Sequence, residues 1–201
     1  MNKKEVEIIK EERTRSHPPY GAFLIFSLFV FVWAVFLYKY TPGEIVEMIG
    51  IENGFIIAFV AAFLGGLSTF SSVPYTLIIV TLGAGGLHPL GLGLVASLGL
   101  FLGDSTSYFL GYYGNGVVPS RLQEYLQRFH NWLVQERFTS VMPFFIFLYG
   151  ALFPFSNDVV VISFGLARYP YWKVMIPLTL GAVVFNTMMA YVGLYGIRLF
   201  G

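Results

Sequence analysis

Two aspartates stand inside apolar stretches of this chain, and they are the first candidates for chemistry. Asp104 lies in the sequence Leu-Gly-Asp-Ser-Thr-Ser-Tyr, and Asp158 lies in the apolar stretch from Leu148 to Ala167. A carboxylate in the core of a bilayer costs roughly 2.5–3.5 kcal/mol on insertion scales, so acids in such places belong mainly to substrate, ion or proton pathways. Each aspartate is therefore predicted to carry a proton or to contact a head group. The structural alternatives are that Asp104 bonds to a facing hairpin and that Asp158 caps the helix that follows it.

The stretch around Asp158 is interrupted in its middle by Phe153-Pro154-Phe155-Ser156-Asn157. Pro154 lacks a backbone donor, and Ser156 and Asn157 compete for backbone hydrogen bonds, so a continuous helix is not expected there. A similar break, from Ser68 to Pro74, interrupts the first long apolar run. Irregular backbone at membrane depth survives only beside protein or a water-filled cavity. Both breaks are therefore predicted to line one internal polar site.

The candidate substrate- or ion-binding residues of this site come from the two breaks and from the segments beside them. They are Ser72, Thr76, Asp104, Ser156, Asn157, Asp158, Arg168 and Asn186. Arg168 has a second interpretation, because arginines and lysines at the ends of membrane helices also determine topology. The three histidines are scattered without a second ligand at metal spacing, so neither a metal site nor a cofactor is expected.

The composition is that of a membrane protein. Hydrophobic residues make up 56% of the chain and charged residues 11%, whereas about a quarter of an ordinary soluble domain is charged. A net charge of +1 without a basic stripe argues against nucleic acid as a partner. The absence of cysteine excludes disulfides and thiol catalysis. One compact integral domain is expected from 201 residues.

The apolar segments predict an all-α fold. Residues 1–19 form a hydrophilic tail, residues 20–40 are long enough for an N-terminal transmembrane helix, and residues 41–54 are interpreted as a polar connection. Two further full spans are predicted at residues 90–112 and 171–200. Residues 117–137 show helical periodicity with a capping box, which predicts an amphipathic helix in the membrane interface or, as an alternative, a partner-binding helix.

Two apolar runs, residues 55–87 and residues 138–168, have lengths that fit neither one span nor two. A single helix of 33 residues would be about 50 Å long, whereas the hydrocarbon core is about 30 Å thick. Two full spans would need about 40 residues and a turn. Each run is therefore predicted to be a re-entrant hairpin of two half-helices that meet at the break.

An internal repeat relates the two halves of the membrane domain. Four glycines recur 82 positions later, and the same offset places Asn186 opposite Asp104; the glycine pairs are Gly83 and Gly165, Gly99 and Gly181, Gly111 and Gly193, and Gly114 and Gly196. Each repeat is a hairpin that returns to its own side and then one span that crosses, so two repeats in series must point in opposite directions. We predict an inverted repeat within residues 50–201, with repeat 1 at about 55–114 and repeat 2 at about 138–200. The glycines are interpreted as helix-packing positions.

The positive charges agree with this topology. Residues 1–19, 113–137 and 168–173 carry ten lysines and arginines and are predicted to lie on the cytoplasmic side, whereas only Lys39 and Arg198 fall on the other side. The N-terminus is therefore predicted to be cytoplasmic, in a protein integral to the cell membrane, plasma or inner.

Residues 103–114 resemble the signature G-D-x-x-x-Y-x-x-G-x-x-G of the DedA family, also called VTT or SNARE-associated membrane proteins. Residues 153–158 and 165–170 are similar to the second hairpin of that family. The resemblance covers roughly residues 50–200. It implies paired re-entrant hairpins and the movement of lipids, either phospholipid scrambling or the recycling of a polyprenyl-phosphate carrier, or else proton-coupled transport.

The chain also departs from the family pattern. Many bacterial members carry R-F-x-P-x-x-R in the second hairpin, whereas Ala151 and Asn157 stand here where the two arginines fall. Those members also place an acid two residues after the proline of the first hairpin, where this chain has Thr76. The missing arginines weaken the case for a bidentate grip on a phosphate in this hairpin and favour ordinary phospholipids.

The function predicted from the sequence is a membrane lipid translocator, scramblase- or flippase-like, that moves phospholipids or a polyprenyl-phosphate carrier through the polar site. The alternatives are a proton- or ion-coupled small-solute transporter and a membrane scaffold or assembly factor. An enzyme is not expected, because Asp104 lacks the preceding glycine of the G-x-G-D motif of intramembrane aspartyl proteases and no Ser/His pair lies in the spans. Membrane lipids are the expected partners, with protons or other ions as further candidates, and a homo-oligomer is left open.

Overall fold

The computed structural model of the chain describes residues 20–67, 72–114, 136–153 and 157–200. Within these ranges all regular structure is helical. In chain order the helices are α2 (Tyr20–Lys39), α3 (Pro42–Ile49), α4 (Ile51–Gly65), α5 (Ser72–Ala84), α6 (Pro89–Gly114), α8 (Glu136–Leu152), α9 (Asp158–Leu166) and α10 (Tyr171–Phe200). The predicted tail at residues 1–19 and most of the predicted interfacial helix, residues 115–135, lie outside the described residues.

Two of these helices are long and apolar enough to cross a membrane, namely α6 over its whole length and α10 over Tyr171–Gly196. A third span is counted when residues 27–39 and 42–49 are taken as one broken span. The described parts of α4, α5 and α8 are apolar but shorter. The all-α membrane-protein fold predicted from the sequence is confirmed.

The helix α2 belongs to a compact unit of its own, which ends at Tyr38. Its aromatic side chains pack along one face: Phe29 stacks on Trp33 with ring centroids 5.8 Å apart, and Trp33 lies tilted against Phe36 at 6.0 Å. These residues are three and four positions apart, the spacing at which side chains meet on a helix. The remaining helices form the second unit, Lys39–Gly201.

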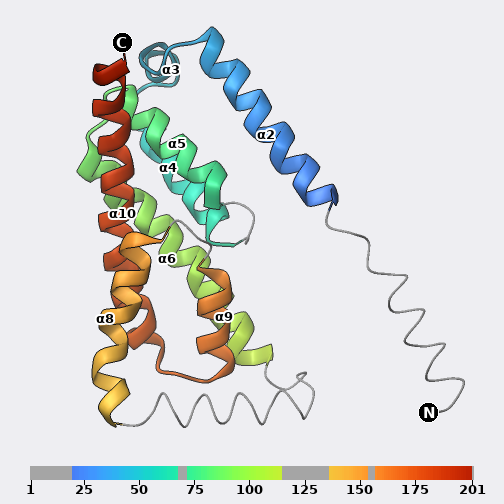
Figure 1. The fold of residues 1–201 in the computed structure, drawn as a ribbon, viewed down its shortest axis with the longest axis vertical. Helices are drawn as coiled ribbons and strands as arrows, with labels where there is room; N and C mark the ends of the chain where they lie inside the picture. The colour runs from blue at the N-terminus through green and yellow to red at the C-terminus, as the bar shows by residue number, and fades with distance from the viewer. Residues whose placement is uncertain (1–19, 68–71, 115–135, 154–156, 201) are drawn as a thin grey trace, which may run out of the picture. The chain divides into compact units, whose positions relative to one another are not determined.

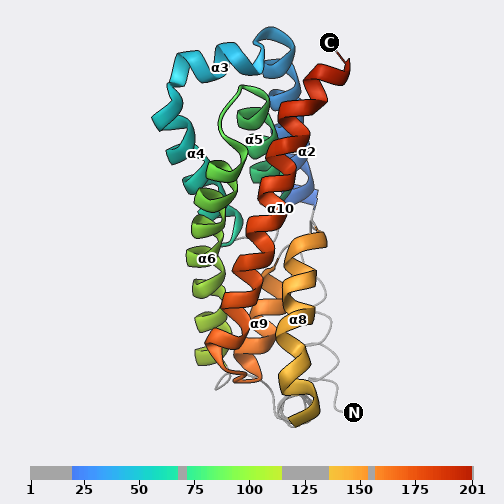
Figure 2. The same ribbon diagram turned by 90° about the vertical axis from the view of Figure 1, so that its left-hand side faces the viewer.

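In the second unit, α6 and α10 run side by side in opposite directions (Figure 1). The helices α4 and α5, hairpin 1, start at the end of the unit where α6 begins, turn back partway along it and return to the same end. The helices α8 and α9, hairpin 2, do the same from the opposite end (Figure 2). In hairpin 1, α4 packs on α6 and α5 packs on α10, whereas in hairpin 2 α8 packs on α10 and α9 packs on α6. The two hairpins thus exchange partners, which is the arrangement of an inverted repeat.

Close backbone contacts at glycines follow the same symmetry. A Cβ added at Gly83 would collide with the carbonyl oxygen of Ala190, and one added at Gly165 would collide with that of Tyr108. Tyr108 and Ala190 are themselves 82 positions apart, as are the two glycines. In the same way, a Cβ added at Gly111 would collide with the carbonyl oxygen of Ile162, and one added at Gly193 would collide with that of Val80. Small residues at these positions let the helices approach closely. At Gly114 and Gly196, by contrast, an added Cβ meets nothing within 4 Å, so in the part of the chain that the structure describes this pair shows no packing contact.

Both hairpins end in the same C-terminal cap. Each cap pairs two backbone amides with carbonyls of the last turn; the bonds are Gly86 to Gly83 and Leu87 to Leu82 after α5, and Arg168 to Gly165 and Tyr169 to Phe164 after α9. The cap requires a positive φ, which is +95° at Gly86 and +52° at Arg168. Glycine adopts this conformation freely, whereas a residue with a side chain loses about 1–2 kcal/mol. Arginine therefore occupies a position for which glycine is the favourable residue.

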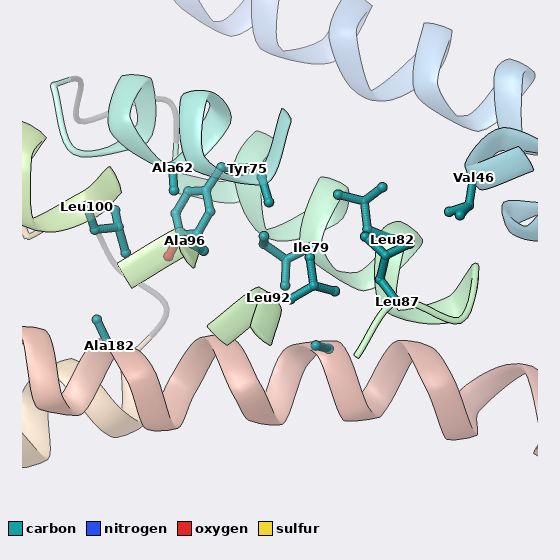
Figure 3. Close-up of a cluster of buried hydrophobic side chains, with 12 residues drawn as sticks. Val46, Ala62, Tyr75, Ile79, Leu82, Leu87, Leu92, Ala96, Leu100 and Ala182 are labelled. Carbon is teal, nitrogen blue, oxygen red and sulfur yellow. The ribbon is translucent and has the colours of Figure 1, made fainter. Parts of the chain in front are cut away.

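The buried apolar side chains form two clusters, one for each hairpin. The first joins α3, α4, α5, α6 and α10, and Figure 3 shows Tyr75 within it beside Ala96 and Leu100. The second joins α6, α8, α9 and α10 and includes Tyr108. On α6 the two clusters are separated by the segment between Leu100 and Tyr108, and this segment contains Asp104.

One prediction about the connections needs correction. Residues 41–54 were expected to form a polar connection, but they contain α3 and the first turn of α4. The side chain of Thr41 accepts a hydrogen bond from the amide of Glu44, and Glu44 accepts one from the amide of Thr41 at 2.7 Å. This capping box starts a short helix within a polar sequence, which composition alone did not reveal.

Candidate functional site

The site is built on one turn in the middle of α6. Asp104 and Ser107 are three residues apart on this helix, so both side chains project from the same side. Asp104 is 3% exposed and Ser107 is also buried. The helix α9 begins against this turn. Asn157 Nδ2 donates to Asp104 Oδ2 at 3.0 Å, and Ser107 Oγ donates to Asp158 Oδ1 at 2.8 Å. The start of α9 is thus held to α6 by two side-chain hydrogen bonds.

The end of α4, from hairpin 1, reaches the same turn. A Cβ added at Gly103 would lie 2.6 Å from the carbonyl oxygen of Phe63 and 2.8 Å from the Cα of Gly66, so the backbones touch here. Ser107 Oγ also lies 3.4 Å from the carbonyl oxygen of Gly66, a long hydrogen bond. Helix ends from both hairpins therefore meet α6 between Gly103 and Ser107.

Asp104 has one carboxylate oxygen that is not satisfied. Its Oδ1 is buried and has no hydrogen-bond partner in the part of the chain that the structure describes. Asp158, Tyr75 and Tyr149 lie within electrostatic range of this carboxyl group. A buried acceptor without a hydrogen-bond partner lowers the stability of the fold by about 1–3 kcal/mol. An oxygen of this kind can accept a hydrogen bond from a group that enters the site. A proton, a water molecule, a cation or the donor group of a lipid head could satisfy this oxygen.

The beginning of α9 adds a favourable field for negative charge. Asn157 is the N-cap residue and makes no side-chain capping bond, while Asp158 is the first residue of the helix. Asp158 therefore lies at the positive end of the helix dipole, which stabilises a carboxylate. The N-cap position itself is held by Asn157, and the side chain of Asp158 accepts a hydrogen bond from Ser107 on another helix.

The structure brings together three of the eight sequence-predicted site residues, Asp104, Asn157 and Asp158. Asn186 lies elsewhere, on α10, where it is fully buried and its Nδ2 donates to Ser97 Oγ at 3.1 Å. Ser97 precedes Asp104 by seven residues, or two helical turns, which is about 10 Å along α6. Asn186 Oδ1 has no partner among the described residues, so the repeat-related positions of Asp104 and Asn186 each hold an unsatisfied oxygen.

Of the other predicted residues, the structure describes the side chains of Arg168 and Thr76. Arg168 is exposed and lies at the far end of α9 from Asp158. Thr76 lies half-buried on α5, and Ser72 begins the same helix, although its side chain is outside the described residues. Ser156 is outside them altogether.

Two residues of the site were missed from the sequence. Ser107 carried a usable signal, because it follows Asp104 by three residues and so shares its helical face. Gly66 carried a weaker one, since the glycine pair 65–66 ends the first apolar run before its break. No pattern in the sequence could pair Ser107 with Asp158, because the bond joins residues 51 positions apart.

Among the described residues, no group of three or more His, Cys, Asp or Glu is placed to hold a metal ion. The described side chains at the turn offer two carboxyl groups, an amide and a hydroxyl. These groups can exchange a proton or make hydrogen bonds to a polar head group.

Comparison with known proteins identifies the family. The family model of the VTT domain matches residues 73–195, which is more than half of the chain and runs from α5 into α10. The match confirms the resemblance noted in residues 103–114. A search of curated proteins and a search of solved structures each found no match. With its helical hairpins, its two spanning helices and this match, the chain belongs to the VTT-domain family of membrane proteins of the DedA type.

Proposed function

We propose that the protein moves lipids between the two leaflets of its membrane, with the polar turn of α6 as the place where the head group passes. The observation that carries the proposal is the meeting of helix ends from both hairpins at Gly103–Ser107, around a buried carboxyl oxygen without a partner. Broken helices that meet between inverted repeats are the usual architecture of transporter sites.

The arrangement of the two hairpins provides a path for the head group between the leaflets. Each hairpin begins at its own end of the unit, and the inner ends of the helices of both hairpins lie near the same level of α6 and α10 (Figure 1). A head group that reaches this level from one leaflet is therefore separated from the other leaflet by only one hairpin. Its acyl chains can stay in the bilayer, because the site needs to replace only the hydration of the head group.

The chemistry of the site bears on the substrate. Asp104 and Asp158 contribute two carboxyl groups, and no arginine or lysine is buried among the described residues. An interior with acids and no buried cation favours head groups that donate hydrogen bonds or carry a positive charge. Phospholipids are thus preferred over a polyprenyl-phosphate carrier as the substrate.

The experiment is lipid translocation in proteoliposomes, with fluorescent phospholipids in both leaflets and dithionite added outside. Wild-type protein should expose the inner-leaflet lipid to quenching, and Asp104→Asn and Asp158→Asn should each slow the exchange at least tenfold. The matched control is Ser105→Ala, because Ser105 neighbours Asp104 but its hydroxyl lies 2.7 Å from that of Tyr171 rather than at the hairpins. Wild-type vesicles in which only the outer leaflet is quenched would rule the proposal out.

A second candidate is a proton- or ion-coupled carrier of small solutes, which the unpaired Oδ1 of Asp104 favours. A carrier of this kind would take up solute when a pH or ion gradient is imposed across the same vesicles, and it would leave lipid exchange at the level of empty vesicles. Asp104→Asn should then abolish the dependence on the gradient.

The orientation is proposed with the N-terminus on the cytoplasmic side of the cell membrane. The end of the unit where α6 stops and α10 starts carries Arg168 and Lys173, and it would face the cytoplasm. Since the chain has no cysteine, a single Lys173→Cys variant can be labelled from either side of the membrane with an impermeant thiol reagent. Labelling of this cysteine in intact cells from outside would show that this end faces outward, and the proposed orientation would then be wrong.

A further inference from the structure

We propose that Arg168 binds the phosphate of a phospholipid head group at the membrane surface, at the end of hairpin 2 remote from Asp104. The proposal extends the proposed lipid translocation. The step in which the head group moves on from Arg168 rests on that function. Binding at Arg168 does not itself depend on translocation, so the two can be tested separately.

The first observation is the backbone of Arg168. It has φ +52°, and among the described residues it is the one non-glycine residue with a positive φ. Its counterpart in hairpin 1, 82 positions earlier, is Gly86, which forms the same cap without strain. The fold therefore has an unstrained solution for this cap, and in hairpin 2 the side chain is kept at a cost in backbone conformation. Such outliers point to a role for the side chain itself.

The second observation is the position of the guanidinium group. It lies over the ring of Tyr112, with 5.3 Å from Cζ to the ring centroid, and Tyr112 stacks in turn on Tyr108 at 6.2 Å. A stack of this kind orients the planar group. The structure shows no ion pair between Arg168 and any described acid, and the residue is exposed. The donors along the edge of the guanidinium are the geometry that fits a phosphate with two parallel hydrogen bonds.

The third observation selects a lipid as the source of the phosphate. The end of the unit that holds Arg168 also exposes Tyr113 (75%), at the end of α6, and Trp172 (62%), at the start of α10. Exposed tyrosine and tryptophan at the ends of spanning helices mark the level of the lipid head groups. Arg168 follows α9, which belongs to the same end, so its guanidinium lies at the level where phosphates of the bilayer are found.

The location also connects this site with the polar turn. Asp158 and Leu166 begin and end α9, and nine helical residues span about 13 Å. A phosphate held at Arg168 would be one half-helix away from Asp104 and Asp158. The α6–α9 pair would thus first receive a lipid by its phosphate and then pass the head group inward along α9.

The test is binding of fluorescent short-chain phosphatidic acid to the purified full-length protein in detergent, measured by anisotropy. Arg168→Ala should weaken binding roughly tenfold, as expected for the loss of one charge-assisted pair, and Arg168→Lys should retain part of the affinity. Arg168→Gly removes the guanidinium while relieving the backbone, so it should lose binding as Arg168→Ala does and remain folded. The matched control is Lys39→Ala, because Lys39 also lies over a ring, that of Tyr40 at 5.7 Å, but precedes α3 instead of following α9.

Unchanged binding in Arg168→Ala and Arg168→Gly would overturn the proposal, and so would an equal loss in Lys39→Ala. Short-chain diacylglycerol should not compete, since it lacks the phosphate. If inorganic phosphate displaced the probe at equal concentration, the site would be one for free phosphate and the lipid assignment would be wrong. If the wild-type protein bound the probe through Arg168 but did not exchange lipids in vesicles, the proposed function would be wrong and the binding site at Arg168 would stand.

Discussion

Gly66, at the end of α4, lies against Gly103 of α6, one residue before Asp104. A Cβ at Gly103 would come within 2.7 Å of the carbonyl carbon of Gly66, and one at Gly66 would come within 3.1 Å of the Cα of Gly103. This contact brings hairpin 1 to the turn that also holds the start of hairpin 2. A larger residue at either position would keep the end of α4 away from the turn that holds Asp104.

The first prediction concerns this contact. Gly103→Ala should push the end of α4 away from α6, because the atoms it meets are backbone and cannot rotate aside. The expected loss is about 1–3 kcal/mol of unfolding free energy, together with slower lipid exchange in vesicles. Thermal unfolding in detergent measures the stability. Gly43→Ala is the control, since its Cβ meets nothing within 4 Å, and an equal loss there would contradict the prediction.

A second prediction addresses the bond between the hydroxyl of Ser107 and the carboxyl of Asp158. Ser107→Ala leaves a buried carboxyl group without this donor, which should cost about 1–3 kcal/mol. In a double-mutant cycle with Asp158→Ala, which removes the acceptor, the two losses should not add, because the residues share one interaction. Thr106→Ala, one position before Ser107, should change stability by less than about 0.5 kcal/mol, because Thr106 is exposed and its hydroxyl donates to the carbonyl oxygen of Leu102 in its own helix. Additive losses would mean that the bond does not stabilise the fold.

The caps of the two hairpins provide a third prediction. Arg168→Gly should be more stable than Arg168→Ala by about 1 kcal/mol, because alanine keeps the strain of a positive φ and glycine relieves it. Gly86→Ala should be destabilised by about 1–2 kcal/mol for the same reason, although an added Cβ has open space there. Differential scanning fluorimetry of the three variants suffices. Equal melting temperatures for the two Arg168 variants would show that the backbone is not strained.

The fourth prediction uses the internal symmetry. Gly83→Ala and Gly165→Ala should destabilise the protein to a similar extent, by more than about 1 kcal/mol, because each new methyl would collide with a backbone carbonyl of a spanning helix. Gly196→Ala should instead be neutral or raise stability by about 0.5–1 kcal/mol, since it lies within α10 with no neighbour within 4 Å. A large loss in Gly196→Ala, or a loss in only one of the paired variants, would argue against equivalent packing in the two repeats.

Much of the helical arrangement could be predicted because lengths constrain it strongly. Runs of 33 and 31 residues fit a roughly 30 Å layer only as paired half-helices, and the structure has hairpins there. The glycine offset predicted the repeat because close helix contacts tolerate few other residues. The prediction failed at residues 41–54, where a capping box starts α3. Gly114 and Gly196 match in sequence but have no packing neighbour among the described residues.

The sequence by itself determined the class of protein, the number of long apolar segments and the two acids worth attention, because hydrophobicity and the cost of buried charge are properties of individual residues and their near neighbours. Only the tertiary structure decided that Asp104 meets Asn157, that Ser107 meets Asp158 and that Arg168 stands apart from both at the other end of α9. Those relationships join positions far apart in the chain, and they depend on which helices pack together and in what direction. Helix pairing arises from the complementarity of whole surfaces, which no local pattern encodes.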